Sequence, residues 1–271
     1  MQLDKRRLIP ASGALALAAS LCLGLASTSW GLPIDHGDFA GDTVSFVDVS
    51  EDSTTDPDAL PLFGSPTVGG DSLDFNGISF ASSPGAGGVD MTNGNLTMGI
   101  ETQVGRAIDT ISLTEAGDYT LFGIPDAAAF AFVGAAAYLD ILEVDGIGIA
   151  PINLQANLIF WPSSGQFDLL TGGPAFARIW NGELVIDVAQ ALRDHHVSGG
   201  ASKVSLTLSN MLATAGASGA ASFINKSDLD ISVRVIPEPA TLALLGAGLL
   251  SLFLMGERRR TGRRQRPRSQ S

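Results

Sequence analysis

Cysteine, histidine and positive charge are all scarce in this chain. Its 271 residues include one Cys and three His, which leaves few side chains for a redox pair or for a metal site built from thiolates and imidazoles. Its 16 Lys and Arg stand against 28 Asp and Glu, a formal net charge of −12, and this balance argues against nucleic acid as a partner. The length is sufficient for one large domain or two small ones with a hydrophobic core.

Recognised catalytic motifs are missing as well. The sequence has no Gly-x-Ser-x-Gly elbow, no Gly-x-Gly-x-x-Gly fingerprint and no Gly-Lys-Thr/Ser phosphate loop. His195 and His196 are adjacent, so their rings diverge on a strand or a helix and do not easily share one metal; we expect them to be exposed loop residues. Paired carboxylates of the glycosidase type exist among the acids, but their spacing selects no pair. The sequence predicts that the chain is not an enzyme.

Residues 1–31 have the features of a secretory signal peptide. A basic start, Lys5-Arg6-Arg7, precedes an uncharged stretch rich in Ala and Leu over residues 8–26, and Gly24-Leu25-Ala26 offers small residues for cleavage. The alternative is a first core helix, which the basic cluster at the extreme N-terminus disfavours. The single cysteine, Cys22, lies inside this stretch, so we expect a mature protein without disulfides.

The C-terminal region combines a proline motif, an apolar run and a basic tail. Pro237-Glu238-Pro239 precedes residues 240–255, which carry no charge. As a helix these residues would cover about 24 Å, short of the ~30 Å hydrocarbon layer, so we expect a short transmembrane helix in contact with membrane lipid. The alternative is a buried helix with a disordered or nucleic-acid-binding tail, but the run has no polar face.

Arginines after the apolar run predict its orientation. Positively charged flanks are retained on the cytoplasmic side of a membrane, so the large N-terminal domain is expected outside. The arginines expected to provide this retention are Arg258, Arg259, Arg260, Arg263 and Arg264, followed by Arg266 and Arg268.

The order of these three features resembles the PEP-CTERM protein-sorting signal, over residues 236–268. The resemblance implies processing by an exosortase, a membrane enzyme of Gram-negative bacteria that make exopolysaccharide and biofilm matrix. It implies an inner-membrane-anchored precursor with a periplasmic ectodomain, later found at the cell surface or outside the cell. Residues 61–75 and 113–123 also resemble a functionally uncharacterised type of PEP-CTERM ectodomain. The predicted division is a signal peptide (1–31), an ectodomain (32–236) and a sorting and anchor segment (237–268).

The two prolines of the motif restrict the backbone conformation around them. Proline lacks an amide hydrogen and keeps the preceding residue extended, so Pro237 and Pro239 hold Ile236 and Glu238 out of helix where the chain leaves the membrane. An extended segment suits the cleft of a processing enzyme. We interpret Glu238, the one charge at this junction, as a recognition residue; an ordinary solvated charge is the alternative.

The central region, residues 32–236, is strongly acidic, and its sequence pattern is typical of β-strands. It has six Lys and Arg against 25 Asp and Glu, a net formal charge of −19, which repels anionic polymers and attracts cations. Apolar residues alternate with polar ones at a period of two. This alternation predicts strands at residues 44–49, 96–100, 108–113, 152–161, 204–208 and 231–235. Many short strands with Gly-rich turns predict an all-β fold, an antiparallel β-sandwich of jelly-roll type.

Turn and helix signals are fewer. Four Asn-Gly or Asp-Gly pairs predict tight hairpins: Asn76-Gly77, Asn93-Gly94, Asp145-Gly146 and Asn181-Gly182. Only residues 188–194 and 127–137 have helical character.

Calcium binding is the best site hypothesis that the sequence offers, and no other cofactor is expected. Eight acids fall within 24 residues, and Asp71, Asp74 and Asn76 precede a glycine, so carboxylate and amide oxygens cluster as Ca²⁺ requires. The predicted calcium ligands are Asp71, Asp74 and Asn76. A solvated acidic loop, in which Asp residues initiate turns, is the alternative.

Two classes of function are therefore compatible with the sequence. In the first, the ectodomain is a non-enzymatic structural or adhesive protein between the cell surface and exopolysaccharide. In the second, it is a secreted carbohydrate-binding module or glycan hydrolase. Exposed aromatic rings are scarce, which weighs against the second class, whereas Trp161 and Trp180 side by side with two carboxylates would favour it.

Overall fold

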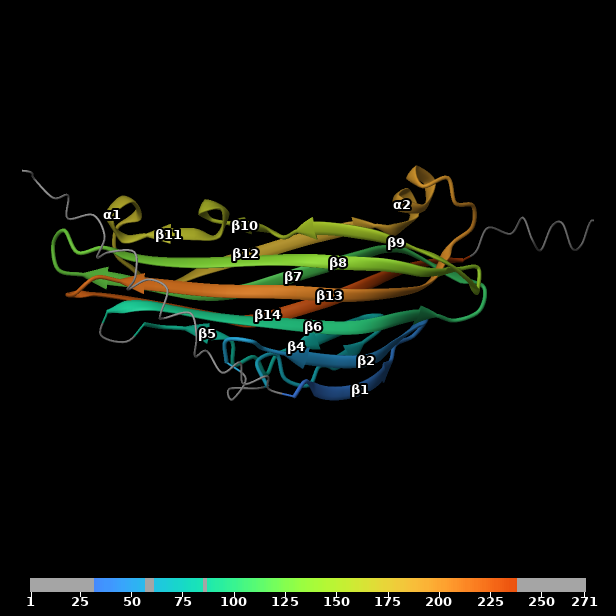
Figure 1. Ribbon diagram of the computed structural model, residues 1–271, viewed down its shortest axis with the longest axis horizontal. Coiled ribbons are helices and arrows are strands. Elements are labelled where there is room, and N and C mark those ends of the chain that lie inside the picture. Colours follow the sequence, from blue (N-terminus) through green and yellow to red (C-terminus); the bar gives the residue numbers. More distant parts are fainter. Residues whose placement is uncertain (1–31, 57–60, 85–86, 238–271) are drawn as a thin grey trace, which may run out of the picture.

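Alternation of buried and exposed residues builds two antiparallel sheets that pack face to face (Figure 1). The computed structural model describes residues 32–56, 61–84 and 87–237. Every strand pair in this part of the chain is antiparallel. The predicted all-β antiparallel sandwich is therefore confirmed.

The first sheet is formed by the strands in the order β1, β2, β6, β13 and β8, with β9 and β11 both along the outer edge of β8. Their bounds are β1 Ile34–Ala40, β2 Val44–Asp52, β6 Gly88–Thr102, β13 Ala201–Gly216, β8 Ala129–Val144, β9 Ile147–Asn157 and β11 Gln166–Asp168.

The second sheet has the order β10, β12, β7, β14, β4 and β3, with β5 also beside β14. Their bounds are β10 Ile159–Trp161, β12 Ala175–Asp187, β7 Arg106–Gly123, β14 Ala220–Pro237, β4 Ser72–Phe75, β3 Thr67–Gly69 and β5 Ala81–Ser82. Among the described residues, strand pairing joins the two sheets at one residue pair, Ala201 of β13 and Ile108 of β7.

Three short helices complete the described fold: a 3₁₀ turn at Ser163–Gly165, α1 at Leu169–Gly172 and α2 at Val188–Asp194. The helix predicted at residues 188–194 is confirmed, and the Asp187 carboxylate caps it by accepting a hydrogen bond from Gln190 N at 2.7 Å. The helical reading of residues 127–137 is wrong. Residues 129–137 lie in β8, where Ala131, Val133 and Ala137 face the core, and residues 127–128 precede this strand without helical structure.

The strand predictions hold because the period of two coincides with burial. On β13, Val204, Leu206 and Leu208 are fully buried, and on β7 so are Ile111 and Leu113. The six predicted segments fall in β2, β6, β7, β9 with β10, β13 and β14. The segment 152–161 differs in one respect, because the strand is interrupted at Leu158.

Only one of the four hairpin signals marks a hairpin. Asp145-Gly146 turns β8 into β9 with positive φ at both residues, 51° and 75°. Asn76-Gly77 simply follows β4, while Asn93-Gly94 and Asn181-Gly182 lie inside β6 and β12.

Close packing explains the two glycines inside strands. A Cβ on Gly94 would lie 2.6 Å from the Phe80 ring, and one on Gly182 would lie 2.3 Å from the Phe160 ring. Both glycines are therefore required for the approach of an aromatic ring rather than for a turn.

A buried carboxylate holds the loop that follows β2. Glu51 is 1% exposed and accepts hydrogen bonds from the backbone N–H groups of Leu62, Phe63 and Gly64 at 3.0, 2.6 and 3.3 Å. His36 Nε2 lies 3.0 Å from the same carboxylate. These bonds satisfy backbone groups that would otherwise be buried without partners, and they place the Phe63 ring in the core.

No helix within residues 32–56, 61–84 and 87–237 is long and apolar enough to cross a membrane. The signal peptide predicted at 1–31 and the transmembrane helix predicted at 240–255 lie outside the described residues.

Substituting Gly182→Ala tests the close packing at Phe160. We expect the added methyl group to lower the free energy of unfolding by about 1–3 kcal/mol, because ring and strand must move apart. Gly148→Ala in β9 is the matched control, since no atom lies within 4 Å of its Cβ position, and it should leave stability unchanged or raise it by up to about 1 kcal/mol. Urea unfolding followed by tryptophan fluorescence measures both, and equal effects would contradict the packing argument.

Candidate functional site

A shallow hollow on the outer face of the second sheet places a tryptophan among polar side chains. It has a volume of about 240 Å³ and is lined by Thr114, Glu115, Ala116, Trp161, Asn181, Gly182, Glu183 and Asp228. The strand register explains this grouping: Trp161 lies opposite Asn181, Asn181 opposite Ala116, and Ala116 opposite Asp228. Residues opposite one another point to the same face, so a single row crosses four strands. With 43% of its surface exposed, Trp161 keeps part of its ring accessible.

The two tryptophans of the described region are not side by side. Trp180 is fully buried, its Nε1 donates a hydrogen bond to Asn225 O at 3.2 Å, and its ring meets Phe160 edge to face at 5.8 Å. Trp180 is therefore a core residue, and Trp161 alone faces outward in this hollow.

A second aromatic group lies on the same face of the second sheet. Phe122 and Phe176 stack with ring centroids 5.9 Å apart, and they are 47% and 69% exposed. Ala116 and Phe122 are both on β7 and an even number of residues apart, so they share a face, about 20 Å apart along the strand. The outer face thus presents two aromatic groups along its length.

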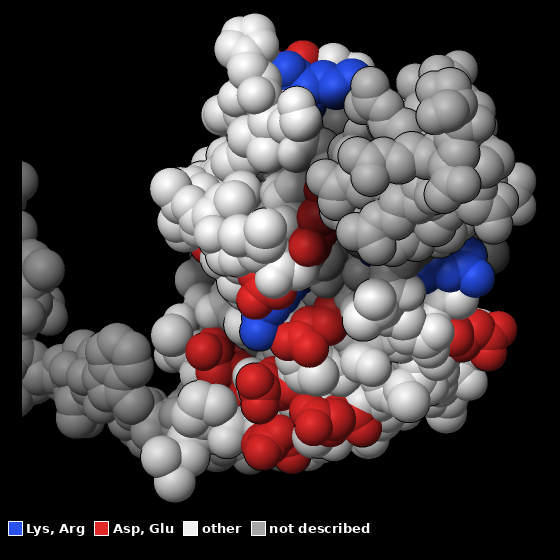
Figure 2. Space-filling view, turned by 90° about the vertical axis from the view of Figure 1, so that its right-hand side faces the viewer, with Lys and Arg blue, Asp and Glu red and all other residues white. Residues whose placement is uncertain are grey.

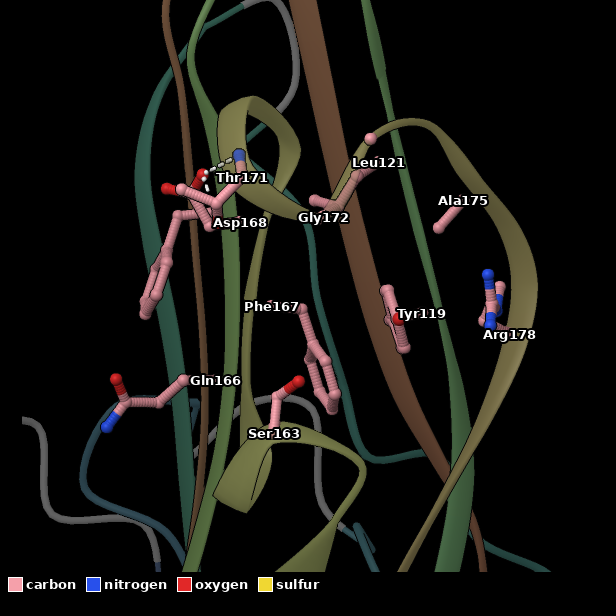
Figure 3. A pocket seen from close by; sticks show the side chains of 12 residues that line it. Tyr119, Leu121, Ser163, Gln166, Phe167, Asp168, Thr171, Gly172, Ala175 and Arg178 are labelled. Atoms are coloured by element: carbon pink, nitrogen blue, oxygen red, sulfur yellow. Dashed lines mark hydrogen bonds between the residues drawn. The ribbon is translucent and has the colours of Figure 1, made fainter.

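A larger hollow opens between the sheets at the end that carries α1 (Figure 3). Its volume is about 440 Å³. The rings of Tyr119 and Phe167 stack at its centre, 3.8 Å between centroids, and both are at least nine-tenths buried. Asp168 uses its carboxylate to cap α1, accepting from Thr171 N at 2.9 Å. Because the two rings cover each other and the carboxylate already caps α1, this hollow presents fewer ring faces and polar groups to a ligand than the hollow at Trp161.

Acidic side chains dominate the end of the sandwich shown in Figure 2, where basic ones are few. On the second sheet, Asp74 of β4 lies directly opposite Asp230 of β14. Burial raises the pKa of Asp230, and the carboxylates of Asp228 and Asp74 raise that pKa further. Like charges in such positions destabilise a sheet.

The predicted calcium ligands are differently engaged. Asp71 accepts hydrogen bonds from Thr43 N and Thr43 Oγ1, both at 2.6 Å, and from Val44 N at 3.2 Å. Burial alone would raise the pKa of Asp71, but these bonds outweigh it and hold the pKa below its usual value. Asp74 faces Asp230, and Asn76 is exposed beyond the end of β4.

Within the described ranges, no group of three or more His, Cys, Asp or Glu side chains is arranged to hold a metal ion. Calcium binding by Asp71, Asp74 and Asn76 stays a prediction. His195 and His196 follow α2 and are exposed, as the sequence predicts.

The residues of the predicted sorting signal begin where the second sheet ends. Val235, Ile236 and Pro237 are the last residues of β14 and pair with Ile108, Ala107 and Arg106 of β7. Ile236 is therefore extended, as expected for a residue before proline. The other residues named for sorting or retention lie outside the described part of the chain: Glu238, Pro239, Arg258, Arg259, Arg260, Arg263 and Arg264.

The sequence interpretation missed a polar cluster in the core. Lys226, Glu115 and Asn210 are each 2% exposed or less, and Lys226 Nζ lies 2.7 Å from Glu115 Oε1. The signal that could have revealed this cluster is the presence of polar residues at inward-facing strand positions. Asn210 continues the inward-facing series of β13 after Leu208, and Glu115 continues that of β7 after Leu113, so both occupy positions expected to be apolar.

Asp230→Asn tests the repulsion between β4 and β14. A folded-state pKa above the unfolded value of 3.8 means that ionisation of Asp230 destabilises the fold as pH rises through this range. We expect the variant to gain about 0.2–1 kcal/mol of unfolding free energy at pH 7, and the gain to vanish below pH 3.8. Urea unfolding across pH measures it.

Asp118→Asn is the matched control for this substitution. Asp118 shares the outer face, but its neighbours across β12 and β14 are Ile179 and Asn225, which carry no charge. A gain at pH 7 as large as that of Asp230→Asn, with the same pH dependence, would contradict the pairwise repulsion.

Comparison with known proteins identifies the C-terminal signal. Residues 235–260 match the PEP-CTERM protein-sorting motif. No curated protein is significantly similar to the chain.

Three similar solved structures are sugar-related. TmCBM61 in complex with β-1,4-galactotriose is 11% identical, with 73% of this chain and 86% of that chain covered and a TM-score of 0.21. The family 11 xylanase from Neocallimastix patriciarum is 10% identical, with coverage of 75% and 99% and a TM-score of 0.19. Trichoderma harzianum endoglucanase 3 from family GH12 is 12% identical, with coverage of 78% and 100% and a TM-score of 0.18. These scores are too low to identify a common fold or to transfer an activity.

The matched sorting motif begins within the last strand of the sandwich, because residues 235–237 belong to both. The chain thus carries a PEP-CTERM protein-sorting motif at residues 235–260, which implies export as a membrane-anchored precursor and processing by an exosortase.

Proposed function

We propose that the β-sandwich is a non-enzymatic adhesive domain that holds neutral matrix polysaccharide on the outer face of its second sheet. The observation that carries this proposal is the exposed Trp161 ring in a hollow lined by Asn181, Glu183 and Asp228. In the exported and processed protein, this face would contact exopolysaccharide at the cell surface or in a biofilm matrix.

The chemistry of the hollow suits a sugar ring. An indole presents a flat apolar face with a negative quadrupole, which packs against the C–H face of a pyranose. The carboxylates of Glu183 and Asp228 accept hydrogen bonds from hydroxyl groups, and the amide of Asn181 both donates and accepts. A site with one apolar platform and a few convergent polar groups is typical of small-ligand recognition.

The length of the face suits a chain rather than a single sugar. The Phe122–Phe176 pair provides a second aromatic surface on the same side of the sheet, about 20 Å from the Trp161 row. An extended glycan could contact both groups at once, and two weak contacts on one chain raise the overall affinity.

Charge selects the kind of polysaccharide. Residues 32–236 carry a net formal charge of −19, and Glu183 and Asp228 line the hollow itself. Anionic glycans would be repelled at low and moderate ionic strength, so neutral glycans are the proposed ligands.

Glycan hydrolysis is the second candidate function. It is favoured by one observation, that two carboxylates, Glu183 and Asp228, line the same hollow as Trp161, because glycosidases act through a pair of carboxyl groups. The two functions differ in product formation.

Trp161→Ala tests the proposed adhesive face. We expect the wild-type protein to bind neutral oligosaccharides on a glycan array, and the variant to bind the best of them about tenfold or more weakly, because the stacking surface is lost. Tyr138→Ala is the matched control, since Tyr138 is similarly exposed, at 44%, but lies on β8 of the other sheet. An array without neutral binders, or equal affinity of Trp161→Ala and wild type, would overturn the proposal.

Release of reducing ends separates adhesion from hydrolysis. The bound glycan is incubated with wild type, Glu183→Gln and Asp228→Asn, and new reducing ends are measured. A non-enzymatic domain gives none. Release by wild type that either substitution abolishes would establish the second candidate instead.

Calcium stabilisation of the domain stays a prediction beside this proposal. If Asp71, Asp74 and Asn76 bind Ca²⁺ in the folded state, the melting temperature must rise with calcium concentration and fall again with a chelator. We expect Asp74→Asn to remove this response and magnesium to reproduce it poorly, because Mg²⁺ demands tighter octahedral geometry. Equal melting temperatures with calcium and with chelator would show that the acidic loop is simply solvated.

A further inference from the structure

Three polar side chains from two sheets meet in the core of the sandwich. Lys226 lies on β14 and Glu115 on β7, both in the second sheet, whereas Asn210 lies on β13 in the first sheet. Lys226 Nζ is 2.7 Å from Glu115 Oε1 and donates a hydrogen bond to Asn210 Oδ1. The lysine amine therefore contacts a carboxylate and a carboxamide at the same time.

Aromatic rings cover the amine. Lys226 Nζ lies 5.5 Å from the ring centroids of both Phe63 and Phe80. The side chains of Lys226 and Glu115 are 0% exposed. Glu115 Oε2 and Asn210 Nδ2 have no hydrogen-bond partner among the described residues. Such an incomplete polar network is costly in an apolar core.

Burial changes the protonation preference of the lysine. Desolvation lowers the pKa of Lys226 and outweighs the charge and the hydrogen bond of Glu115, which act to raise it. Burial therefore favours the neutral amine of Lys226 over its ammonium form. A neutral amine is a nucleophile, and the atom it contacts belongs to an amide.

We propose that Lys226 and Asn210 form an intramolecular isopeptide bond, with Glu115 as the proton acceptor and donor for the reaction. This modification site is independent of the saccharide face, which lies on the outer side of the second sheet. It would join β13 of the first sheet to β14 of the second by a covalent bond through the core.

The reaction is balanced without any co-reactant. Glu115 takes a proton from Lys226 Nζ, and the free electron pair attacks Asn210 Cγ to form the Nζ–Cγ bond. A second proton passes from Nζ to Nδ2, the Cγ–Nδ2 bond breaks, and Nδ2 leaves as ammonia. Ammonia accepts the proton held by Glu115 and departs as ammonium, so the carboxylate is restored. No oxidation or reduction takes place.

Neighbouring residues exclude water from the reacting groups and hold them together. The apolar rings of Phe63 and Phe80 keep water from competing with the amine for the amide, and the Glu51 carboxylate fixes the backbone that carries Phe63. Asn210 and Lys226 lie on consecutive strands, so the native fold itself brings the reacting atoms together.

Peptide mapping of the folded full-length protein after denaturation tests the bond. Trypsin cleaves after Lys203, Lys226 and Arg234. Without the bond it yields two separate peptides, 204–226 and 227–234. With the bond Lys226 resists cleavage, and we expect a single peptide, 204–234, lighter than its sequence by one ammonia molecule. Two peptides of unaltered mass would overturn the proposal.

The same peptide map distinguishes the isopeptide bond from a second reaction that releases ammonia. Cyclisation of Asn210 onto its own backbone also releases ammonia, but it leaves Lys226 free and cleavable. A light peptide 204–226 together with peptide 227–234 would therefore show a succinimide and overturn the isopeptide assignment.

Glu115→Gln tests the proton transfer with an isosteric change. We expect cross-linking to slow by a factor of about 10² or more, because the amide cannot accept the proton. Glu101→Gln is the matched control, since Glu101 also pairs with a lysine at 2.7 Å, but on the surface, and it should cross-link like wild type. Equal cross-linking in Glu115→Gln and wild type would overturn the role of Glu115, and the wild-type map stands whether or not the variant folds.

Discussion

The backbone pairing of β7 with β12 on one side and β14 on the other is the interaction on which the rest of the structure depends. Both ladders run along most of the strand, and Ile108 also makes the single link to the first sheet. Since side chains alternate along a strand, one strand serves two environments. Its inward residues present Glu115 to Lys226, and its outward residues, Thr114 and Ala116, form the floor of the Trp161 hollow.

The buried charges are hard to reconcile with stability alone. A lysine and a glutamate without full hydrogen bonding cost several kcal/mol relative to apolar residues of similar volume. The fold nevertheless builds an aromatic cover over them, held by the Glu51 carboxylate. Conversion of the amine and the carboxamide into an amide would remove the ionisable amine of Lys226 and the unpartnered amide nitrogen of Asn210 from the core. It would also supply a covalent staple to a region whose described residues contain no cysteine.

The sequence predicted what depends on local periodicity and missed what depends on neighbours. Alternation in β2, β13 and β14 predicted burial, and through it the sandwich, because the pattern and the core face coincide. Asn-Gly pairs misled, since glycine serves a turn at Gly146 but makes room for an aromatic ring at Gly94 and Gly182. The Trp161 hollow could not be predicted, because its residues meet only when β10, β12, β7 and β14 are ordered side by side. Lys226 is one of the six cations of residues 32–236, and its burial depends on neighbours in the fold that the sequence does not reveal.

The connection between the sandwich and the sorting motif suggests a mechanical role for the buried cluster of Lys226, Glu115 and Asn210. Pro237 still pairs with Arg106, so β14 runs into the matched sorting motif, which begins at Val235. A pull on the chain beyond Pro237 would act directly on the end of β14, whose ladder with β7 can open locally from that end. The inward-pointing Lys226 lies well inside β14, and a bond from it to Asn210 would pass the load to β13, which pairs with both β6 and β8 in the other sheet. The strand most exposed to pulling would then be the one tied through the core to the centre of the opposite sheet.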